Sequence, residues 1–266
     1  MIDNPRSPRV RAVAKLAKRD ARLETGLFLL EGPQAVAEAL TFRPELVVEL
    51  YATPTALDRY TDIAQTAVDA GVDVEFVSEQ VLESMADTVT PQGLVAVCHQ
   101  FPTSLKDILA DGPKLIAILE EVRDPGNAGT IIRAADAAGA DAVILTGRSV
   151  DLYNPKVVRA TTGSLFHLPV AVGIELESVI ERVKSAGLTI LAADIKGDDL
   201  LTARRDGALS GPTAWLFGNE ARGLSTEHFA LADRAVAVPI YGHAESMNLA
   251  TAASVCLYES AFSQRE

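Results

Sequence analysis

The chain lacks the residues on which several classes of protein depend. It has 266 residues but only two cysteines, Cys98 and Cys256, too few for a cysteine-ligated metal cluster or a disulfide-rich scaffold. No apolar run reaches the roughly 18 residues that a membrane-spanning helix needs, and the N-terminus has no apolar segment typical of a secretion signal. We therefore expect a globular, cytoplasmic protein with no membrane segment and no bound metal.

Positive charge is also scarce. The chain has 24 lysines and arginines against 36 acidic residues, and its net charge of −12 argues at first against a polyanionic partner. Residues 1–22 are the exception: seven basic and two acidic residues give them +5, which leaves −17 for the remainder. This basic arm is suited to nucleic acid, although a solvated helix face has the same composition.

The hydrophobic pattern alternates short β-rich runs with helical stretches, which predicts an α/β protein. In the first part we expect strands at 27–31, 46–52, 72–77 and 93–99, and helices at 33–40, 56–70 and 78–86. Ser78 is a suitable cap for the last of these helices. In the second part we expect strands at 114–121, 141–146, 167–172, 188–194, 213–218 and 234–240. These later runs are almost continuously apolar, which indicates a mostly parallel sheet that is buried on both faces.

Proline, serine, aspartate and glycine accumulate between the two parts, where the strand pattern stops. We therefore place a first domain at 1–105, a linker at 106–113 and a second domain at 114–266.

A first candidate site is the segment EEVRDPGNAGTIIRAADAAGAD (120–141), in which a helix is expected to begin near Asn127 after a glycine turn. The free amides of such a helix start suit an anion. Gly126 and Gly129 do not have the spacing of a dinucleotide fingerprint, and the chain has no phosphate-binding P-loop. Arg133 lies on the same helix side as Asn127, but pairing with a neighbouring aspartate on a solvated face is an equally simple role.

A second candidate site is LFGNEARGLS (216–225), directly after an apolar strand. In an open parallel sheet, ligands bind at this carboxyl edge. Gly218 and Gly223 allow close backbone approach, and Asn219 and Glu220 are polar. A plain turn is the alternative.

A third candidate site is VPIYGHAESMNLATAASVCLYES (238–260), where a loop leads into a helix of small and apolar residues expected at 246–262. Ser246 and Asn248 are both suitable caps for its start, and residues of these types are more often caps than catalysts. His243 has no evident partner and is treated as incidental.

Together and in this order, the three segments resemble the three motifs of the SpoU, or TrmH-type, RNA 2′-O-ribose methyltransferases. The matching residues are Asn127, Gly129, Arg133 and Gly139 in the first motif, Phe217, Gly218, Asn219, Glu220 and Gly223 in the second, and Pro239, Gly242, Ser246, Asn248, Leu249, Ala252 and Glu259 in the third. Residues 9–40 are similar to the opening of the substrate-binding domain of ribosomal RNA members. The resemblance thus covers nearly the whole chain.

The resemblance implies a ribosomal-protein-like α/β RNA-binding domain in front of a catalytic α/β domain with a parallel sheet and a deep trefoil knot. It also implies S-adenosylmethionine as cofactor and a homodimer formed through the knotted domain. Because a true knot breaks the usual rule that chains do not thread loops, periodicity alone could not have revealed it.

The resemblance further implies roles for individual residues. The expected catalytic residues are Arg133, Asn127, Glu220, Ser246 and Asn248. The expected cofactor contacts are Gly218, Asn219, Ile240, Met247, Asn248 and Leu249. The expected RNA contacts of the basic arm are Arg9, Arg11, Lys15, Lys18, Arg19 and Arg22, with Arg148, Lys156 and Arg159 as further cations. Met247 stands where family members commonly have leucine, an exchange that conserves volume, and Tyr241 stands where methionine is frequent.

In similar enzymes the arginine at the position of Arg133 has been proposed as a base. A free guanidinium has a pKa above about 12, so its deprotonation is costly. We therefore expect Arg133 to clamp a phosphate beside the target ribose and to orient the 2′-hydroxyl.

The expected function is S-adenosylmethionine-dependent methylation of a ribose 2′-hydroxyl, which requires an RNA substrate. The separate N-terminal domain favours ribosomal RNA, in particular 23S, over transfer RNA. A non-catalytic RNA-binding or ribosome-assembly protein on the same fold is a second alternative, against which the intact Arg133, Glu220 and Asn248 argue. A Rossmann-type dehydrogenase is a third, against which the missing glycine fingerprint argues.

Overall fold

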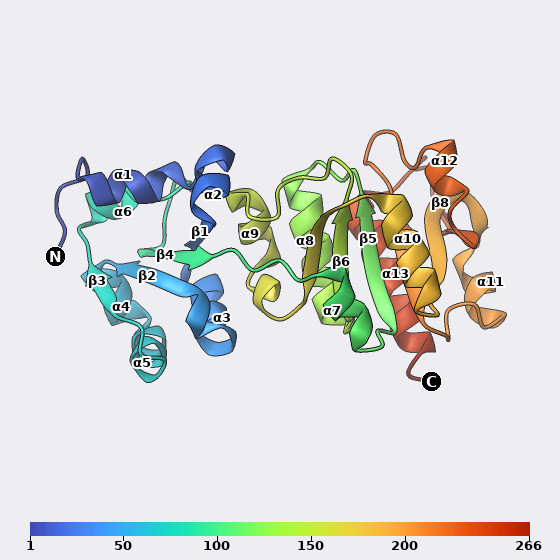
Figure 1. The fold of residues 1–266 in the computed structure, drawn as a ribbon, viewed down its shortest axis with the longest axis horizontal. Helices are drawn as coiled ribbons and strands as arrows, with labels where there is room; N and C mark the ends of the chain where they lie inside the picture. Colours follow the sequence, from blue (N-terminus) through green and yellow to red (C-terminus); the bar gives the residue numbers. More distant parts are fainter. The chain divides into compact units, whose positions relative to one another are not determined.

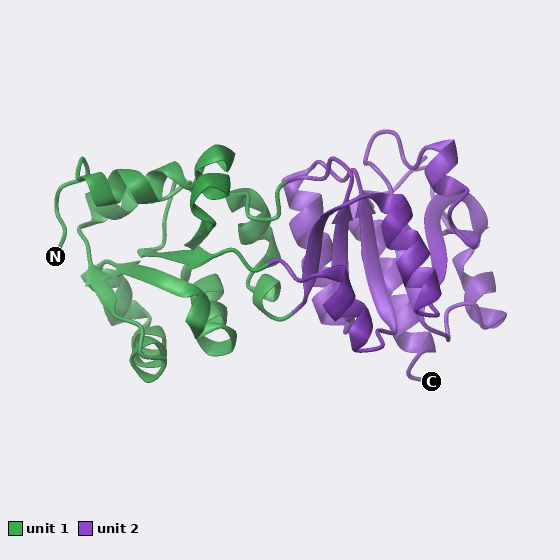
Figure 2. Ribbon diagram, viewed as in Figure 1, with its two compact units in different colours: residues 1–101, 151–167 green, residues 102–150, 168–266 purple.

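The computed structural model describes residues 1–266, which divide into two compact units (Figures 1 and 2). The first unit comprises residues 1–101 and 151–167, and the second comprises residues 102–150 and 168–266. Both units combine helices with a sheet, which confirms the expected α/β class. None of the helices is both long and apolar enough to cross a membrane.

The first unit is built on a four-stranded sheet in the order β1-β4-β2-β3. The strands are β1 (Leu27–Glu31), β2 (Val47–Ala52), β3 (Val74–Phe76) and β4 (Leu94–His99). β4 pairs antiparallel with both β1 and β2, whereas β2 and β3 are parallel. Residues of α1 and α6, Val10 and Leu82 among them, pack on Leu29 and Tyr51 of this sheet and form one face of its core.

Four of the seven helices of the first unit begin at a side-chain cap. The seven helices are α1 (Pro8–Lys15), α2 (Arg19–Thr25), α3 (Pro33–Phe42), α4 (Pro54–Arg59), α5 (Thr61–Asp69), α6 (Glu79–Met85) and α9 (Pro155–Thr161), with short 3-10 turns at Pro44–Leu46 and Ser164–Phe166. Those with a side-chain cap are α1, α4, α6 and α9. Ser78 caps α6 as predicted, since its hydroxyl accepts a hydrogen bond from the amide of Val81. The single helix expected at 56–70 is two helices, because the chain leaves the helical conformation at Tyr60.

The second unit is built on a six-stranded sheet in the order β10-β8-β9-β5-β6-β7. The strands are β5 (Leu115–Glu120), β6 (Ala142–Thr146), β7 (Val170–Ile174), β8 (Thr189–Asp199), β9 (Thr213–Phe217) and β10 (Arg234–Ala237). Every neighbouring pair is parallel, which confirms the prediction of a parallel sheet. All the carboxyl ends of these strands therefore lie at one edge of the sheet.

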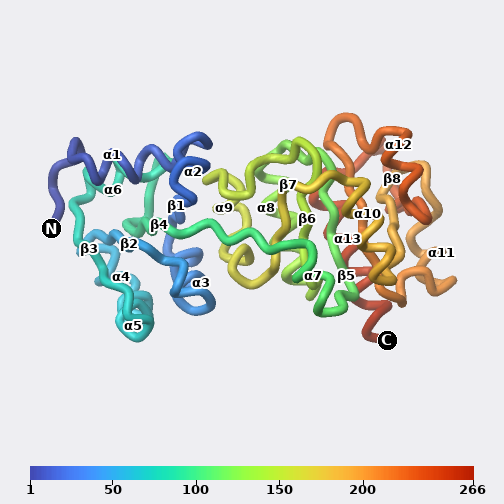
Figure 3. The backbone as a smooth tube through the Cα atoms, in the orientation of Figure 1, coloured from blue at the N-terminus to red at the C-terminus, as the bar shows by residue number.

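Helices cover both faces of this sheet. They are α7 (Leu105–Ala110), α8 (Pro125–Ala138), α10 (Leu176–Ser185), α11 (Leu200–Arg205), α12 (Thr226–Phe229) and α13 (Leu249–Ser263). Ile118 and Leu216 are packed with residues of α7 and α10. Trp215 lies on the opposite face, where its Nε1 donates to Ser260 Oγ of α13 over 2.9 Å. α13 packs beside α8 and against β9 and β5, and Figure 3 traces the backbone between these elements.

Two segments depart from the predicted organisation. Residues 106–113, expected as a linker, hold most of α7, whose Leu105 and Ile108 are buried in the core of the second unit. Residues 151–167 follow β6 in sequence but belong to the first unit. The residues that fix this segment are Asp151, which binds Arg22, and Tyr153, whose hydroxyl accepts from the amide of Phe101 over 2.7 Å.

Candidate functional site

The first of the three motifs forms the turn between β5 and α8. Asp124 caps α8, because its Oδ1 accepts a hydrogen bond of 2.7 Å from the amide of Asn127. The helix therefore begins at Pro125, two residues before the expected position. Proline at this position leaves no unpaired amide, so it suits the first helical turn.

Glu220 of the second motif holds this turn from the side. Its Oε1 accepts from the amide of Asp124 over 2.9 Å, and its Oε2 accepts from the amide of Arg123 over 3.3 Å. The Nδ2 of Asn127 also approaches Oε1 at 3.5 Å. Hydrogen bonds from an amide to a carboxylate are stronger than those between neutral groups. The structure thus brings Glu220 and Asn127 together, as the motifs predict.

Asn248 of the third motif joins the same group. Its Oδ1 accepts from the amide of Thr251 and caps α13, and its Nδ2 donates to Asn127 Oδ1 over 2.9 Å. Ser246 does not cap the helix, which begins at Leu249, three residues later than expected. A side chain with both an acceptor and a donor is needed for these two contacts, and asparagine supplies both.

The second motif is a tight turn that depends on two glycines. A Cβ on Gly218 would lie 2.5 Å from the carbonyl carbon of Gly223 and 2.6 Å from the amide nitrogen of Leu224. Gly223 itself has φ +64°, a conformation that glycine adopts without strain. Asn219 completes the turn, because its Nδ2 donates to the carbonyl of Glu121 over 2.8 Å. Glycine is therefore required at Gly218 for reasons of space alone.

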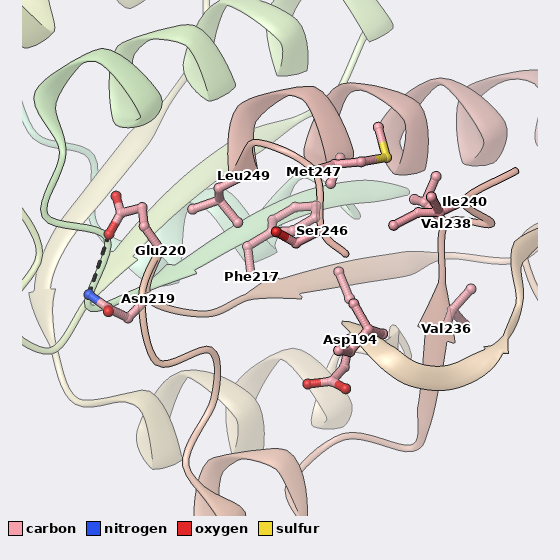
Figure 4. A pocket seen from close by; sticks show the side chains of 13 residues that line it. Asp194, Phe217, Asn219, Glu220, Val236, Val238, Ile240, Ser246, Met247 and Leu249 are labelled. Carbon is pink, nitrogen blue, oxygen red and sulfur yellow. Dashed lines mark hydrogen bonds between the residues drawn. The ribbon is translucent and has the colours of Figure 1, made fainter. Parts of the chain in front are cut away.

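A pocket lies at the carboxyl edge of the sheet (Figure 4). Its lining is mostly apolar with a few polar side chains: Ala193, Asp194, Ile195, Phe217, Asn219, Glu220, Val236, Val238, Ile240, Ser246, Met247, Leu249 and Ala252. Figure 4 shows that Asp194 comes from β8, Val236 from β10, and Met247 from the turn that leads into α13.

The pocket gathers most of the residues predicted to contact a cofactor. Asn219, Ile240, Met247 and Leu249 line it, and so do Ser246 and Glu220. Gly218 and Asn248 are not lining residues but are adjacent to them in the chain. Sequence reasoning missed Asp194, Val236 and Val238. Asp194 ends the strand expected at 188–194, although β8 itself continues to Asp199, and Val236 and Val238 lie near the end of β10. These positions were the available signal, because ligands bind at the carboxyl edge of the sheet.

Arg133 lies on the exposed side of α8, six residues after Asn127. It is not among the residues that line the pocket. The structure therefore gathers Asn127, Glu220 and Asn248 through hydrogen bonds, but it places Arg133 farther along the helix.

The position of Arg22 contradicts its predicted role as an RNA contact. Only 3% of its side chain is exposed, and its Nη2 lies 2.6 Å from Asp151 Oδ2. Its Nη1 donates to the carbonyls of Leu16 and Ala17. Arg22 therefore connects parts of the first unit and is not available to a phosphate. This burial could not be predicted from sequence, because the partner of Arg22 lies 129 residues away.

Two other expected cations are also engaged in ion pairs within the first unit. Arg9 pairs with Glu49 and Glu75. Arg159 pairs with the buried Glu31 and with Asp87, each at 3.0 Å. The remaining predicted RNA contacts of the basic arm are exposed: Arg11, Lys15, Lys18 and Arg19.

Neither cysteine is suited to act as a nucleophile. Burial raises the pKa of Cys98 to about 12, and burial likewise raises the pKa of Cys256 to about 12. A thiol reacts as its thiolate, which such a pKa makes rare near neutral pH.

Comparison with known proteins agrees with this geometry. Residues 114–258 match the model of the SpoU rRNA methylase family, and residues 29–104 match that of the RNA 2′-O ribose methyltransferase substrate-binding domain. A 23S rRNA (guanosine(2553)-2′-O)-methyltransferase of Bacillus subtilis is 34% identical over 97% of this chain and 97% of its own length. A 23S rRNA (uridine(2479)-2′-O)-methyltransferase of Streptomyces viridochromogenes is 32% identical over 93% of this chain and 86% of its own length.

Solved structures agree as well. The AdoMet-bound rRNA methyltransferase of Sinorhizobium meliloti superposes with a TM-score of 0.84 and 33% identity, covering 97% of this chain and 96% of that one. The fold is that of the RNA 2′-O-ribose methyltransferases that use S-adenosylmethionine. The chain belongs to the SpoU rRNA methylase family. The predicted enzyme class and cofactor are confirmed.

Proposed function

We propose that this protein methylates the 2′-hydroxyl of one ribose in 23S ribosomal RNA and that S-adenosylmethionine binds in the pocket of Figure 4. The observation that carries the proposal is the hydrogen-bonded group of Asn127, Glu220 and Asn248, which joins all three motifs at the edge of that pocket. The relatives that act on 23S ribosomal RNA and match nearly the whole chain support this choice of substrate.

The residues of the pocket fit the cofactor. Phe217, Val236 and Leu249 offer apolar surface for an adenine ring. Asp194 and Glu220 bring carboxylates to the same pocket, and these suit a ligand that carries an ammonium and a sulfonium charge. When bound, the cofactor supplies an electrophilic methyl carbon, and the protein supplies alignment.

The chain's own residues serve to hold the two reactants in line. Asn248 fixes the turn that encloses the pocket, and Glu220 fixes the turn before α8 through two backbone amides. We assign Arg133 the role of clamping an RNA phosphate with its planar guanidinium and orienting the ribose hydroxyl. Ser246, on the pocket wall, is assigned to the substrate end.

The proposal includes the deep trefoil knot in the second unit. β10 is an edge strand of the sheet, yet α13 packs on β9 and β5, which lie further in. Residues 238–248 must therefore return across the ends of intervening strands before α13 begins. A true knot, in which the chain also threads a loop, is rare among folds, and the likeness to solved members of the family supports our proposal of one here.

The proposal also includes a homodimer formed through α13 and α8. Tyr258 and Phe262 of α13 are 38% and 51% exposed, and their rings lie 5.6 Å apart. The hydroxyl of Tyr258 donates to the carbonyl of Ala137 at the end of α8. Two exposed aromatic residues side by side on one helix are typical of a surface that binds another chain.

The first unit is assigned to RNA binding, as a domain of the ribosomal-protein-like type. The match to the substrate-binding family model supports this role. The exposed cations of α1 and α2, Arg11, Lys15, Lys18 and Arg19, supply charge for phosphate contacts. An enzyme that acts on ribosomal RNA works in the cytoplasm, where we place this one.

Transfer of labelled methyl groups to unmodified ribosomal RNA and transfer RNA, presented separately, tests the substrate. Incorporation into ribosomal RNA alone is expected. Incorporation into transfer RNA alone would show that transfer RNA, and not ribosomal RNA, is the substrate. The protein could also bind the cofactor and yet transfer no methyl group to naked RNA or to ribosomal assembly intermediates. That result would favour a non-catalytic RNA-binding protein.

A further inference from the structure

A single carboxylate oxygen holds two arginines at the edge of the catalytic sheet. Glu121 Oε2 accepts from Arg123 Nη2 over 3.1 Å and from Arg222 Nη2 over 3.2 Å. Arg123 belongs to the first motif's turn and Arg222 to the second motif's loop. The two arginine side chains are 49% and 67% exposed, so both guanidinium groups are accessible from solvent.

The backbone of Glu121 is held in an unusual conformation at this point. Its φ is +51°, a left-handed value that few residues other than glycine adopt. Asn219 stabilises this conformation by donating to the carbonyl of Glu121 over 2.8 Å. Strained residues of this kind are concentrated at functional sites. The carboxylate is thus kept between the two arginines by the same loop that carries Asn219 and Glu220.

The position of this cluster is close to the site of methylation. Glu121, Arg222 and Asn219 line a groove at the carboxyl edge of the sheet, and Asn219 also lines the cofactor pocket. The backbone amide of Arg123 donates to Glu220. Glu120 and Glu227 also line the groove, so an anion would meet favourable charge only at the rim where the two arginines converge.

We propose that Arg123 and Arg222 form a phosphate-binding site for substrate RNA and that Glu121 occupies this site when RNA is absent. The proposal rests on the function proposed above. An RNA phosphate oxygen would replace Glu121 Oε2 between the two guanidinium groups, which are geometrically matched to phosphate. Ion pairs between exposed groups are weak, so the exchange of one anion for another is easy.

The charge distribution of the chain favours this use of the two arginines. An acidic protein needs local cations to bind RNA, and several candidates are already neutralised by buried or internal partners, as with Arg22 and Arg159. Arg123 and Arg222 share one carboxylate between them, so these two guanidinium groups carry one more charge than Glu121 neutralises.

The test is the salt dependence of binding to an unmodified ribosomal RNA transcript, measured for the full-length protein. Arg222→Ala and Arg123→Ala are expected to weaken binding several-fold and to lower the slope of log affinity against log salt by about one each. Arg222→Lys should keep the slope. Arg205→Ala, an exposed arginine of α11, is the matched control and should leave affinity and slope unchanged.

Glu121→Gln separates a substrate site from a structural bridge. If Glu121 competes with RNA, removing its charge should strengthen binding by about two- to five-fold, the strength of an exposed ion pair. The Glu121→Gln, Arg222→Ala double variant should lose this gain. Weaker binding in Glu121→Gln, or an unchanged salt slope in both arginine variants, would overturn the proposal and leave the cluster as a brace between two loops.

Two controls distinguish this proposal from the proposed function. Cofactor binding by each variant, measured by calorimetry, is expected to match the wild type, which shows that the loops are folded. If the wild-type protein transfers methyl groups to the same transcript but the variants have unchanged salt slopes, only the proposed phosphate site is rejected. Failure of the wild type to transfer methyl groups would reject the function itself.

Discussion

Asn248 Nδ2 donates to Asn127 Oδ1 over 2.9 Å, although the two residues are 121 positions apart in the chain. Asn248 also caps α13 through its Oδ1. The amide of Asn127 donates to Asp124, the cap of α8. The contact of Asn248 with Asn127 therefore sets the start of one helix against the start of the other. The turn that encloses the cofactor pocket lies immediately before Asn248, so the contact also positions the wall of the pocket.

The two roles of Asn248 can be separated by substitution. Asn248→Asp retains an oxygen to cap α13 but cannot donate to Asn127, so we expect stability close to wild type with at least a tenfold slower methyl transfer, about 1.4 kcal/mol. Asn248→Ala should lose both, with a further loss of about 1 kcal/mol in the free energy of unfolding. Urea unfolding and single-turnover transfer measure these effects. Equal turnover in Asn248→Asp and wild type would show that the contact has no catalytic importance.

Gly218→Ala is expected to disrupt cofactor binding. The added Cβ would lie 2.5 Å from backbone atoms of Gly223, so the loop of the second motif must move. Overpacking of this kind costs about 1–3 kcal/mol. If the loop can relieve this strain only by opening, the Kd for S-adenosylmethionine should rise by about five- to 150-fold. Gly211→Ala is the control, because a Cβ there meets nothing within 4 Å. Similar Kd values for both variants would contradict the steric argument.

The hydroxyl groups of α13 provide a matched pair for stability. Ser260→Ala would leave the buried Trp215 Nε1 without its acceptor, so the free energy of unfolding should fall by about 1–3 kcal/mol. Ser263 Oγ is buried and makes no hydrogen bond, so Ser263→Ala should be neutral or slightly stabilising. Chemical denaturation of both variants tests the comparison. A larger loss in Ser263→Ala than in Ser260→Ala would be inconsistent with it.

The pH dependence of stability should include a contribution from Asp233. Burial raises the pKa of this carboxyl, but hydrogen bonds from Lys184 Nζ at 2.6 Å and from the amide of Ile190 at 2.8 Å outweigh it, so the pKa lies below its usual value. The charged form is favoured by folding. Its contribution is therefore complete above the unfolded pKa of about 3.9 and is lost as the pH falls through the lower folded value.

Asp233→Asn isolates this contribution. Because 40% of the Asp233 side chain is exposed and water screens the pair, the loss at pH 7 should be at most about 1 kcal/mol. The difference between wild type and variant should shrink when urea unfolding is repeated at about pH 3. A difference that stays constant from pH 7 to pH 3 would exclude the ion pair as its cause.

The parallel sheet and the three motif loops were accessible from sequence for local reasons. Apolar runs such as 213–218 reveal buried strands, and glycine or asparagine directly after them marks the functional edge. Ser78 was recognised as a cap because a cap bonds to an amide three residues away. Predictions that depend on neighbours in the chain were therefore confirmed, with shifts of a few residues at the ends of elements.

Predictions that depend on distant partners were less successful. The burial of Arg22 requires Asp151, and the placement of residues 151–167 in the first unit requires contacts that periodicity cannot encode. The contact of Asn127 with Asn248 has the same character. α7 was missed because Leu105 and Ile108 are too few to outweigh the surrounding turn-forming residues. In each case the deciding interaction is tertiary.

The most direct test of the account is transfer of labelled methyl from S-adenosylmethionine to unmodified ribosomal RNA by wild type, Arg133→Ala and Arg133→Lys, followed by alkaline hydrolysis. The account predicts one alkali-resistant linkage with wild type, because a methylated 2′-oxygen cannot attack the neighbouring phosphate. It predicts a loss of transfer of at least about 100-fold, or 2.7 kcal/mol, in both variants with cofactor binding retained. Alkali-labile label, or near-normal transfer by Arg133→Ala, would contradict it.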